Sequence, residues 1–116
     1  MLDGMDCLFC KIATGTIPAK KVFEDEHALA ILDIHPQAPV HMLVIPKKHV
    51  ASLAETGSSD KELLGHLLEV ARELAVERRL DGGYRVIINT GPNGGQTVDH
   101  LHLHVLGGRA MHWPPG

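Results

Sequence analysis

The chain has 116 residues, of which 44% are hydrophobic and 22% are charged, a balance typical of one globular domain over residues 1–116. A formal net charge of -3 argues against general nucleic-acid binding and favours a small-molecule partner. The amino-terminal stretch carries acids where a signal peptide carries bases, and no apolar run approaches the roughly 18 residues of a membrane span, so we expect a cytoplasmic protein without a membrane partner.

Both cysteines, Cys7 and Cys10, form one C-x-x-C pair near the amino terminus. In a reducing compartment such a pair indicates a metal clip or a redox couple before a structural disulfide, and two buried free thiols are the alternative. A short helix is predicted over residues 8–14, because Gly15 can end it and Pro18 follows.

Extended segments are predicted next, over residues 21–24 and 28–34, with the acidic EDEH between them as a hairpin turn whose type the sequence does not specify. The loop HPQAP then leads to a short apolar run over 42–45, which has the length of a strand. His41 stands at the start of that run.

The longest helix is predicted over about residues 60–79. Ser59 and Glu62 have the spacing of a capping box, and five apolar residues follow one helical face: Leu63, Leu67, Val70, Ala71 and Leu74. His27, on the preceding turn, and His66, on this helix, are expected to be surface side chains without a role.

Two more strands are predicted after the helix, over residues 84–89 and 98–106, with the glycine-rich loop GPNGG between them. Strands that follow one another closely along the chain favour antiparallel pairing. We therefore predict an α+β fold: an antiparallel sheet of about five strands, one long helix on a face of it, and a short amino-terminal helix.

The stretch VDHLHLHVLGG sets His100, His102 and His104 at alternate positions. Alternate side chains of a strand project from one face about 6.5 Å apart, so the three imidazoles would share a face and the aliphatic residues the other. The glycines on both sides suit a close approach of backbone to a ligand, which we favour over a strand whose solvent face happens to carry histidines.

An imidazole with a pKa near 6.5 is largely neutral at pH 7, and it is both a nucleophile and a competent leaving group. These properties suit a two-step displacement at phosphorus through a covalent intermediate, without a catalytic metal. An H-x-H pair with a third histidine can instead hold a catalytic zinc with one open position.

The run HLHLHVL at 100–106, between GGQTVD and GGRAMHWPPG, resembles the histidine triad (HIT) family and its Hint branch of purine nucleoside phosphoramidate hydrolases. The similarity extends to CLFCKIATGTIPAKKVFEDE and LDIHPQAPVHMLVIPKKH. It implies a homodimer that binds purine nucleotides and acts on adenosine 5′-phosphoramidates or aminoacyl-adenylate-like compounds. The alternative to a hydrolase is a nucleotide-binding interaction module whose turnover is incidental.

Matching residue by residue, the resemblance implies that His102 is the nucleophile that forms a nucleotidyl-histidine. His104 and His41 would flank the phosphate, and Thr97 would lie beside the leaving group. The implied nucleotide contacts are Asp33 for the ribose, Asn89 for the phosphate, Gly95 and Gln96 for the close approach, Phe9, Ile12 and Ile34 for the base, and Trp113 in a tail that reaches the partner subunit.

Two positions depart from the family pattern. Thr97 replaces a frequent serine, and Asp99 replaces a common aromatic residue before the first triad histidine. Without the resemblance, Asp33 reads as an acid that caps a turn, Trp113 as a surface aromatic, and Asn89 and Gln96 as polar loop residues.

The resemblance also implies a structural zinc, because some members that keep the C-x-x-C use a Cys₂His₂ ligand set. The matching ligands here are Cys7, Cys10, His49 and His100. Such an ion would tie the amino-terminal helix to the base of the triad strand, and no cofactor would be needed for catalysis.

Overall fold

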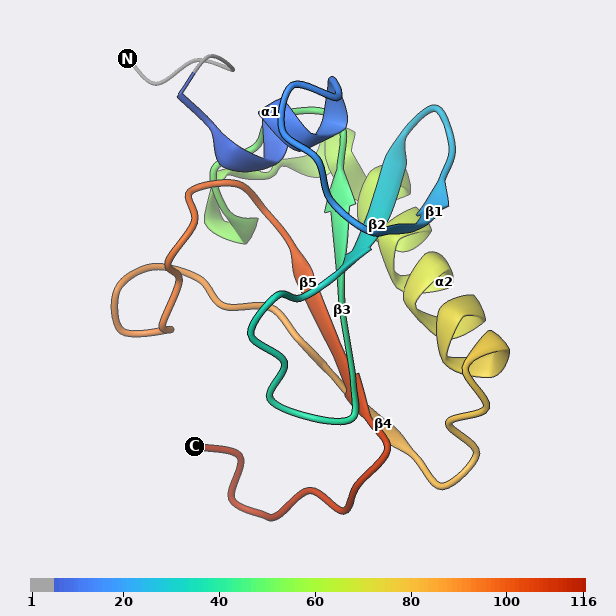
Figure 1. The fold of residues 1–116 in the computed structure, drawn as a ribbon. Coiled ribbons are helices and arrows are strands. Elements are labelled where there is room, and N and C mark those ends of the chain that lie inside the picture. Colours follow the sequence, from blue (N-terminus) through green and yellow to red (C-terminus); the bar gives the residue numbers. More distant parts are fainter. Residues whose placement is uncertain (1–5) are drawn as a thin grey trace.

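Five strands form one antiparallel sheet in the computed structural model, which describes residues 6–116 (Figure 1). The strands are β1 (Lys21–Glu24), β2 (Ala28–Leu32), β3 (Val40–Pro46), β4 (Tyr84–Ile87) and β5 (Leu103–Gly107). The helices are α1 (Leu8–Ala13) and α2 (Lys61–Glu77), with 3-10 turns at Leu53–Glu55 and Ser58–Asp60. The predicted α+β fold is confirmed. Residues 1–5, which belong to the stretch predicted not to be a signal peptide, lie outside the described residues.

The sheet order is β1-β2-β3-β5-β4, so the last strand in sequence lies inside the sheet and β4 lies at its edge (Figure 1). The first three strands form the expected meander, and β4 and β5 form an antiparallel pair. After α2 the chain forms the edge strand and then returns to fill the place beside β3. This insertion brings the histidine segment into the middle of the molecule.

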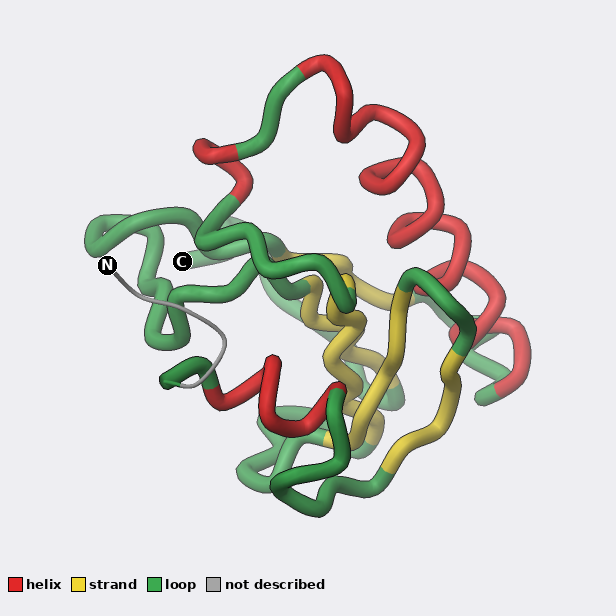
Figure 2. Tube along the Cα trace, turned by 90° about the horizontal axis from the view of Figure 1, so that it is seen from above, coloured by secondary structure: helices red, strands yellow, loops and turns green. Residues whose placement is uncertain are grey.

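Both faces of the sheet are covered, α2 lying on one and α1 on the other (Figure 2). Successive side chains of a strand point to opposite faces. On β3, Met42 and Val44 therefore belong to the cluster under α2, while Leu43 and Ile45 belong to the cluster under α1. A strand covered on both faces reads as a continuous apolar run, which is what residues 42–45 show.

The long helix begins at Lys61 and not within the predicted capping box at Ser59. The preceding 3-10 turn is closed by Asp60, whose Oδ2 accepts the Gly57 N–H at 3.0 Å and whose Oδ1 accepts the Lys48 ammonium at 2.7 Å. The spacing located the start of the helix but selected the wrong capping residue. Neither helix in residues 6–116 is long and apolar enough to cross a membrane.

Three predicted strands are shorter than expected, and for β2 a side chain explains where the strand ends. β2 stops at Leu32, since Asp33 Oδ1 accepts the His35 N–H at 2.8 Å and forms a turn. β4 stops at Ile87. β5 begins only at Leu103, so His100 and His102 precede the regular strand. The expected alternation still holds, because Leu101, Leu103 and Val105 pack in the cluster under α2, whereas the three histidines lie on the α1 side.

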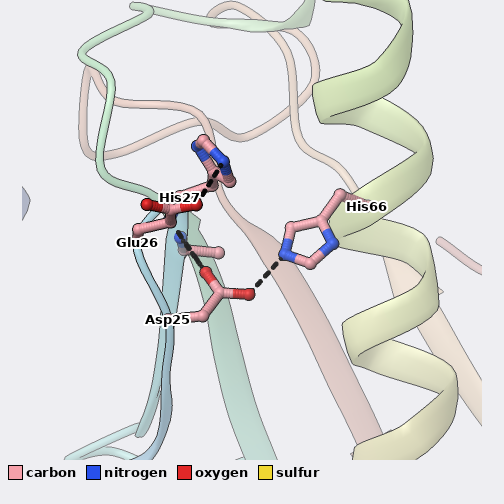
Figure 3. Close-up of polar contacts among 5 residues, drawn as sticks. Asp25, Glu26, His27 and His66 are labelled. Atoms are coloured by element: carbon pink, nitrogen blue, oxygen red, sulfur yellow. Dashed lines mark hydrogen bonds and ion pairs between the residues drawn. The ribbon is translucent and has the colours of Figure 1, made fainter.

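His66 has a structural role, so the expectation that it is a surface side chain without one is wrong. Asp25 Oδ1 accepts the N–H groups of His27 and Ala28, each at 2.8 Å, and closes the turn between β1 and β2. Its other oxygen, Oδ2, lies 2.7 Å from His66 Nε2, so one carboxylate links this turn to α2 (Figure 3). His27 and Glu26, which form a looser pair at 3.5 Å, are exposed as expected.

Replacing Asp25 with alanine should lower the free energy of unfolding by about 2 kcal/mol, because it removes three hydrogen bonds of a half-buried group. Urea denaturation measures this difference. Glu26→Ala is the matched control on the same turn, and an equal loss in that variant would contradict the role of Asp25.

The stabilisation by Asp25 should also depend on pH. Burial of the carboxyl opposes ionisation, but the hydrogen bonds from His27, Ala28 and His66 outweigh it and hold the pKa of Asp25 below its ordinary value of 3.8. The difference between wild type and Asp25→Ala should therefore be complete above pH 3.8 and disappear as the pH falls through the lowered pKa.

Candidate functional site

A pocket of about 540 Å³ opens on the α1 face of the sheet. It brings together seven of the twelve predicted catalytic and nucleotide-binding residues: Phe9, Ile12, Asp33, Ile34, Thr97, His102 and His104. Ile17, Leu43 and Val98 also line it and were not predicted as site residues. The alternation along β3 could have indicated Leu43, whereas Ile17 and Val98 carry no signal in the sequence that marks them.

One end of the pocket is apolar. Phe9 and Ile12, from α1, are buried, and the Phe9 ring meets the His102 ring edge-on with 5.0 Å between centroids. Ile34 is 86% exposed at the rim, where a bound molecule could cover it. A flat apolar group fits this end, where the His102 ring stands beside Phe9.

The proton position on His102 follows from its hydrogen bond. Nδ1 lies 2.7 Å from the backbone oxygen of His100, and a carbonyl oxygen only accepts, so Nδ1 carries the proton. The neutral ring then has its lone pair on Nε2. His102 is 6% exposed, which holds the ring in one orientation against Phe9. This is the state in which an imidazole can act as a nucleophile.

His41 and His104 meet because neighbouring strands place them on one face. His104 is opposite Leu43 in the β3–β5 register, and His41 is two residues before Leu43, on the same face. His41 Nε2 lies 2.8 Å from His104 Nδ1 and 3.4 Å from Asp33 Oδ2. His41 does not line the pocket itself, but it contacts His104 and Asp33, which do.

A backbone amide sets the tautomers of this histidine pair. The N–H of Gln37 donates to His41 Nδ1 at 3.1 Å, so the proton of neutral His41 is on Nε2. Nε2 can then donate to His104 Nδ1, which leaves the His104 proton on its own Nε2. Sequence reasoning missed Gln37, because a main-chain group carries no residue-type signal.

Both rings are neutral in this arrangement. Burial, with smaller effects of the nearby His102 and His41 and against the charge of Asp33, lowers the pKa of His104 to about 4. Burial also lowers the pKa of His41, against the charge of Asp33. At neutral pH the pair therefore forms a hydrogen-bond chain that ends in a donor at His104 Nε2.

The four predicted zinc ligands converge at the start of α1. Cys7 Sγ lies 3.1 Å from His100 Nδ1, Cys10 Sγ lies 3.3 Å from His49 Nδ1, and the two Nδ1 atoms are 3.1 Å apart. All four ligand atoms lie within 4.8 Å of one another. Tetrahedral zinc bonds of ordinary length give ligand separations of about 3.3–3.8 Å, so a small movement accommodates the ion.

The protonation of His100 suits metal binding. Its Nε2 lies 2.8 Å from the Pro46 oxygen and must donate to it, which leaves the lone pair on Nδ1, toward the cysteines. Burial lowers the pKa of His100, and burial together with the neighbouring Cys7 raises the pKa of Cys10 to about 11. A divalent cation would offset the cost of burying thiolates here.

A second group, Asp33, His41 and His104, also has the composition of a metal site. Binding through His41 Nε2 would require the ring proton on Nδ1, where the Gln37 N–H already points. The position of the ring proton therefore favours a cation at His100 and disfavours one at His41.

The polar residues of the glycine loop are tied to backbone. Gln96 Nε2 donates to the oxygens of Ala51 and Val98, at 2.7 and 3.0 Å, and Asn89 Nδ2 donates to the Gly94 oxygen at 2.7 Å. They shape the loop that carries Thr97 into the pocket. The pocket lining does not include Asn89, Gly95 or Gln96. Trp113 is 83% exposed in the tail. The nucleotide contacts of these four residues stay predictions.

Comparisons with known proteins agree with this geometry. The chain is 54% identical to a HIT family hydrolase from Legionella pneumophila, with a TM-score of 0.94 and coverage of 96% of this chain and 100% of that one. It is 50% identical to the 14 kDa zinc-binding protein of Zea mays, over 99% of this chain and 91% of that protein. It is 35% identical to a histidine triad nucleotide-binding protein from Candida albicans, with a TM-score of 0.81 and coverage of 94% and 83%. Because residues 14–111 also match the HIT domain, the chain belongs to the HIT family.

Proposed function

We propose that this protein hydrolyses purine nucleoside phosphoramidates, such as adenosine 5′-phosphoramidates, and aminoacyl-adenylate-like compounds at the α-phosphorus. The observation that carries the proposal is the hydrogen bond from His102 Nδ1 to the His100 oxygen, which leaves an unprotonated Nε2 beside a pocket with an apolar end. Two similar proteins, described as a hydrolase and as nucleotide-binding, support this class.

The pocket suggests how the nucleotide binds. The base would occupy the apolar end, and the Asp33 carboxylate would accept hydrogen bonds from the ribose hydroxyls. The α-phosphorus would then lie near His102 and the leaving group near Thr97. Seven further residues complete the proposed binding site: Phe9, Ile12, Ile34, Asn89, Gly95, Gln96 and Trp113.

The proposed reaction has two steps. His102 Nε2 forms a bond to the α-phosphorus as the phosphorus–nitrogen bond breaks, and the amine leaves with a proton relayed from water through the site. The hydroxide left from that water then forms a bond to phosphorus as the phosphorus–Nε2 bond breaks, which releases the nucleoside monophosphate and restores neutral His102. In both steps His104 Nε2–H would donate to a phosphoryl oxygen and offset its charge.

Turnover of a small substrate panel tests the function. The panel crosses adenosine and cytidine 5′-phosphoramidates with small and bulky amines, and the purine compounds should give the higher kcat/KM. The panel also shows the effect of Thr97, whose methyl group would disfavour bulky amines beside the leaving group. Tight nucleotide binding without turnover of any compound would contradict hydrolysis and favour a binding module.

We infer that zinc at Cys7, Cys10, His49 and His100 has a structural role. These residues would hold α1 against the segment that precedes β5, and α1 supplies Phe9 to the pocket. Zinc would supply charge neutralisation for the two thiolates, while no step of the proposed reaction passes through it.

Exposed apolar side chains fit the proposed homodimer. Leu68 and Val76, on α2, are 51% and 72% exposed, and Tyr84 and Val86 are exposed on the edge strand β4. A second copy of the chain could cover both elements and pair with the edge strand.

Val76→Lys should convert the proposed dimer to a monomer, because the new charge would be buried at the interface. Sedimentation velocity at micromolar concentration measures this, with Glu26→Lys, on the exposed β1–β2 turn, as the control. Trp113 fluorescence should change on addition of AMP to the dimer and less in the monomer. A wild-type monomer, or an unchanged spectrum at saturating AMP, would contradict a tail shared between subunits.

A further inference from the structure

The segment that leaves β5 is tied to the loop between β2 and β3. Arg109 follows the glycine pair at the end of this strand, and its Nη2 and Nε donate to the Gln37 oxygen at 3.0 and 3.3 Å. Its third hydrogen bond, from Nη1 to the Ala110 oxygen at 3.1 Å, holds the side chain to its own segment. One arginine thus connects the start of the tail to the loop that precedes His41.

The glycine before Arg109 allows this close approach. Gly108 has φ +91°, and a Cβ atom there would lie 2.9 Å from Pro39 Cβ, nearer than side chains pack. Gly108 and Arg109 therefore touch the same loop at two points, Pro39 and Gln37. Two contacts on one short loop fix its orientation better than either contact alone.

Gln37 carries this contact to the histidine pair. Its oxygen accepts from Arg109, and its N–H, on the other side of the same α-carbon, donates to His41 Nδ1 at 3.1 Å. That N–H is the group that places the His41 proton on Nε2 and, through it, the His104 proton on Nε2. If the Gln37 backbone turned, His41 could adopt the other tautomer and His104 would lose its donor.

We propose that Arg109 is a positioning residue for the hydrolysis: it holds the Gln37 backbone so that His41 keeps the tautomer in which His104 presents an N–H to the phosphoryl group. This inference rests on the proposed function. Arg109 lies outside the pocket and acts through Gln37 and His41, so its removal should affect kcat more than KM.

Arg109→Ala should lower kcat about tenfold with KM changed less than twofold. The loss is smaller than the roughly 10²- to 10⁴-fold typical of a removed acid–base or electrostatic group, because His41 and His104 are still present. Arg109→Lys keeps one donor for the Gln37 oxygen and should recover part of the loss. Arg109→Gln replaces the alanine variant if that variant does not fold.

The ¹⁵N imidazole spectrum of the resting protein provides a readout that a general loss of stability would not produce. In wild type the His41 signals, assigned with His41→Gln, should report an unprotonated Nδ1, and Arg109→Ala should shift them toward a mixture of tautomers. Arg85→Ala is the matched control, because Arg85 also donates to a tail oxygen, that of His112, but does not touch Gln37. It should leave the His41 signals and kcat unchanged.

The outcomes separate the positioning role from the function. Wild-type kcat in Arg109→Ala, an unchanged His41 tautomer, or an equal effect of Arg85→Ala would overturn the role of Arg109. A shifted tautomer in a protein that turns over no compound of the panel would overturn the proposed function and support the control of His41 by Arg109.

Discussion

His102→Ala should lower turnover of the best phosphoramidate by about 10³-fold or more while AMP affinity changes little. The ring supplies the only covalent route in the proposed reaction, and its loss removes an interaction made with the reacting phosphorus and not with the base or ribose. A residue that merely lines the pocket would instead raise KM.

The covalent intermediate can be observed directly. Rapid quenching in mild base should trap a nucleotidyl group on the peptide over residues 98–106, and His102→Ala should abolish it. His104→Ala should slow turnover less than His102→Ala does, because general acid–base and electrostatic groups typically contribute about 10²- to 10⁴-fold and water can replace part of the hydrogen bonding of His104. An adduct on His104 or His41 would show that the nucleophile is another histidine.

Two further variants control for packing and for surface effects. His102 is buried against Phe9, so truncation to alanine opens space, whereas His102→Asn keeps more volume and should lose turnover to a similar extent. His27→Ala removes a histidine that is exposed and outside the pocket, and it should retain wild-type turnover. Near-normal turnover in both His102 variants would exclude this residue as the nucleophile.

Much of the fold could be predicted because its signals are local. The apolar spacing along α2 and the continuous apolar run of β3 follow from helix and strand periodicity, and both are present. The place of β5 between β3 and β4 could not be predicted, since it depends on which edges meet after the long helix. The end of β2 at Asp33 depends on one side-chain hydrogen bond that competes with the strand.

The candidate site also has features that could be predicted from the sequence and features that could not. The resemblance to the HIT family predicted the Cys7, Cys10, His49 and His100 cluster, which the structure brings together. What the sequence could not supply is the direction of each imidazole. These directions are set by main-chain groups, the oxygens of His100 and Pro46 and the amide of Gln37, and any residue type provides such groups. His100 therefore keeps its lone pair on Nδ1 and His102 keeps its lone pair on Nε2, a difference that only the fold creates.

Purified protein should contain about one zinc per chain, and Cys7→Ser should lower the melting temperature by about 10 °C or more. Four ligand atoms already lie within 4.8 Å, and thiolates select zinc over magnesium. A structural zinc contributes many kcal/mol to folding, while about 3 kcal/mol is enough for a shift of this size in a chain of this length. Cys7 also accepts the Cys10 N–H at the start of α1, and a serine hydroxyl can still accept there, so the expected loss reports the ion and not the helix cap.

Calorimetry with and without a chelator separates a structural zinc from a catalytic one. Chelation should lower the melting temperature and reduce turnover in parallel, and added zinc should restore both. The zinc affinity should weaken as the pH falls, because protons compete for the thiolates and imidazoles. Cys10→Ser should match Cys7→Ser, whereas Thr14→Ser, at the end of α1 and away from the cluster, should retain zinc and stability.

Metal well below one equivalent in protein prepared without chelator would contradict the site. Loss of turnover while the fold remains intact would instead place the ion in the reaction, since zinc on the cysteines affects the pocket only by holding α1 and its Phe9 in position.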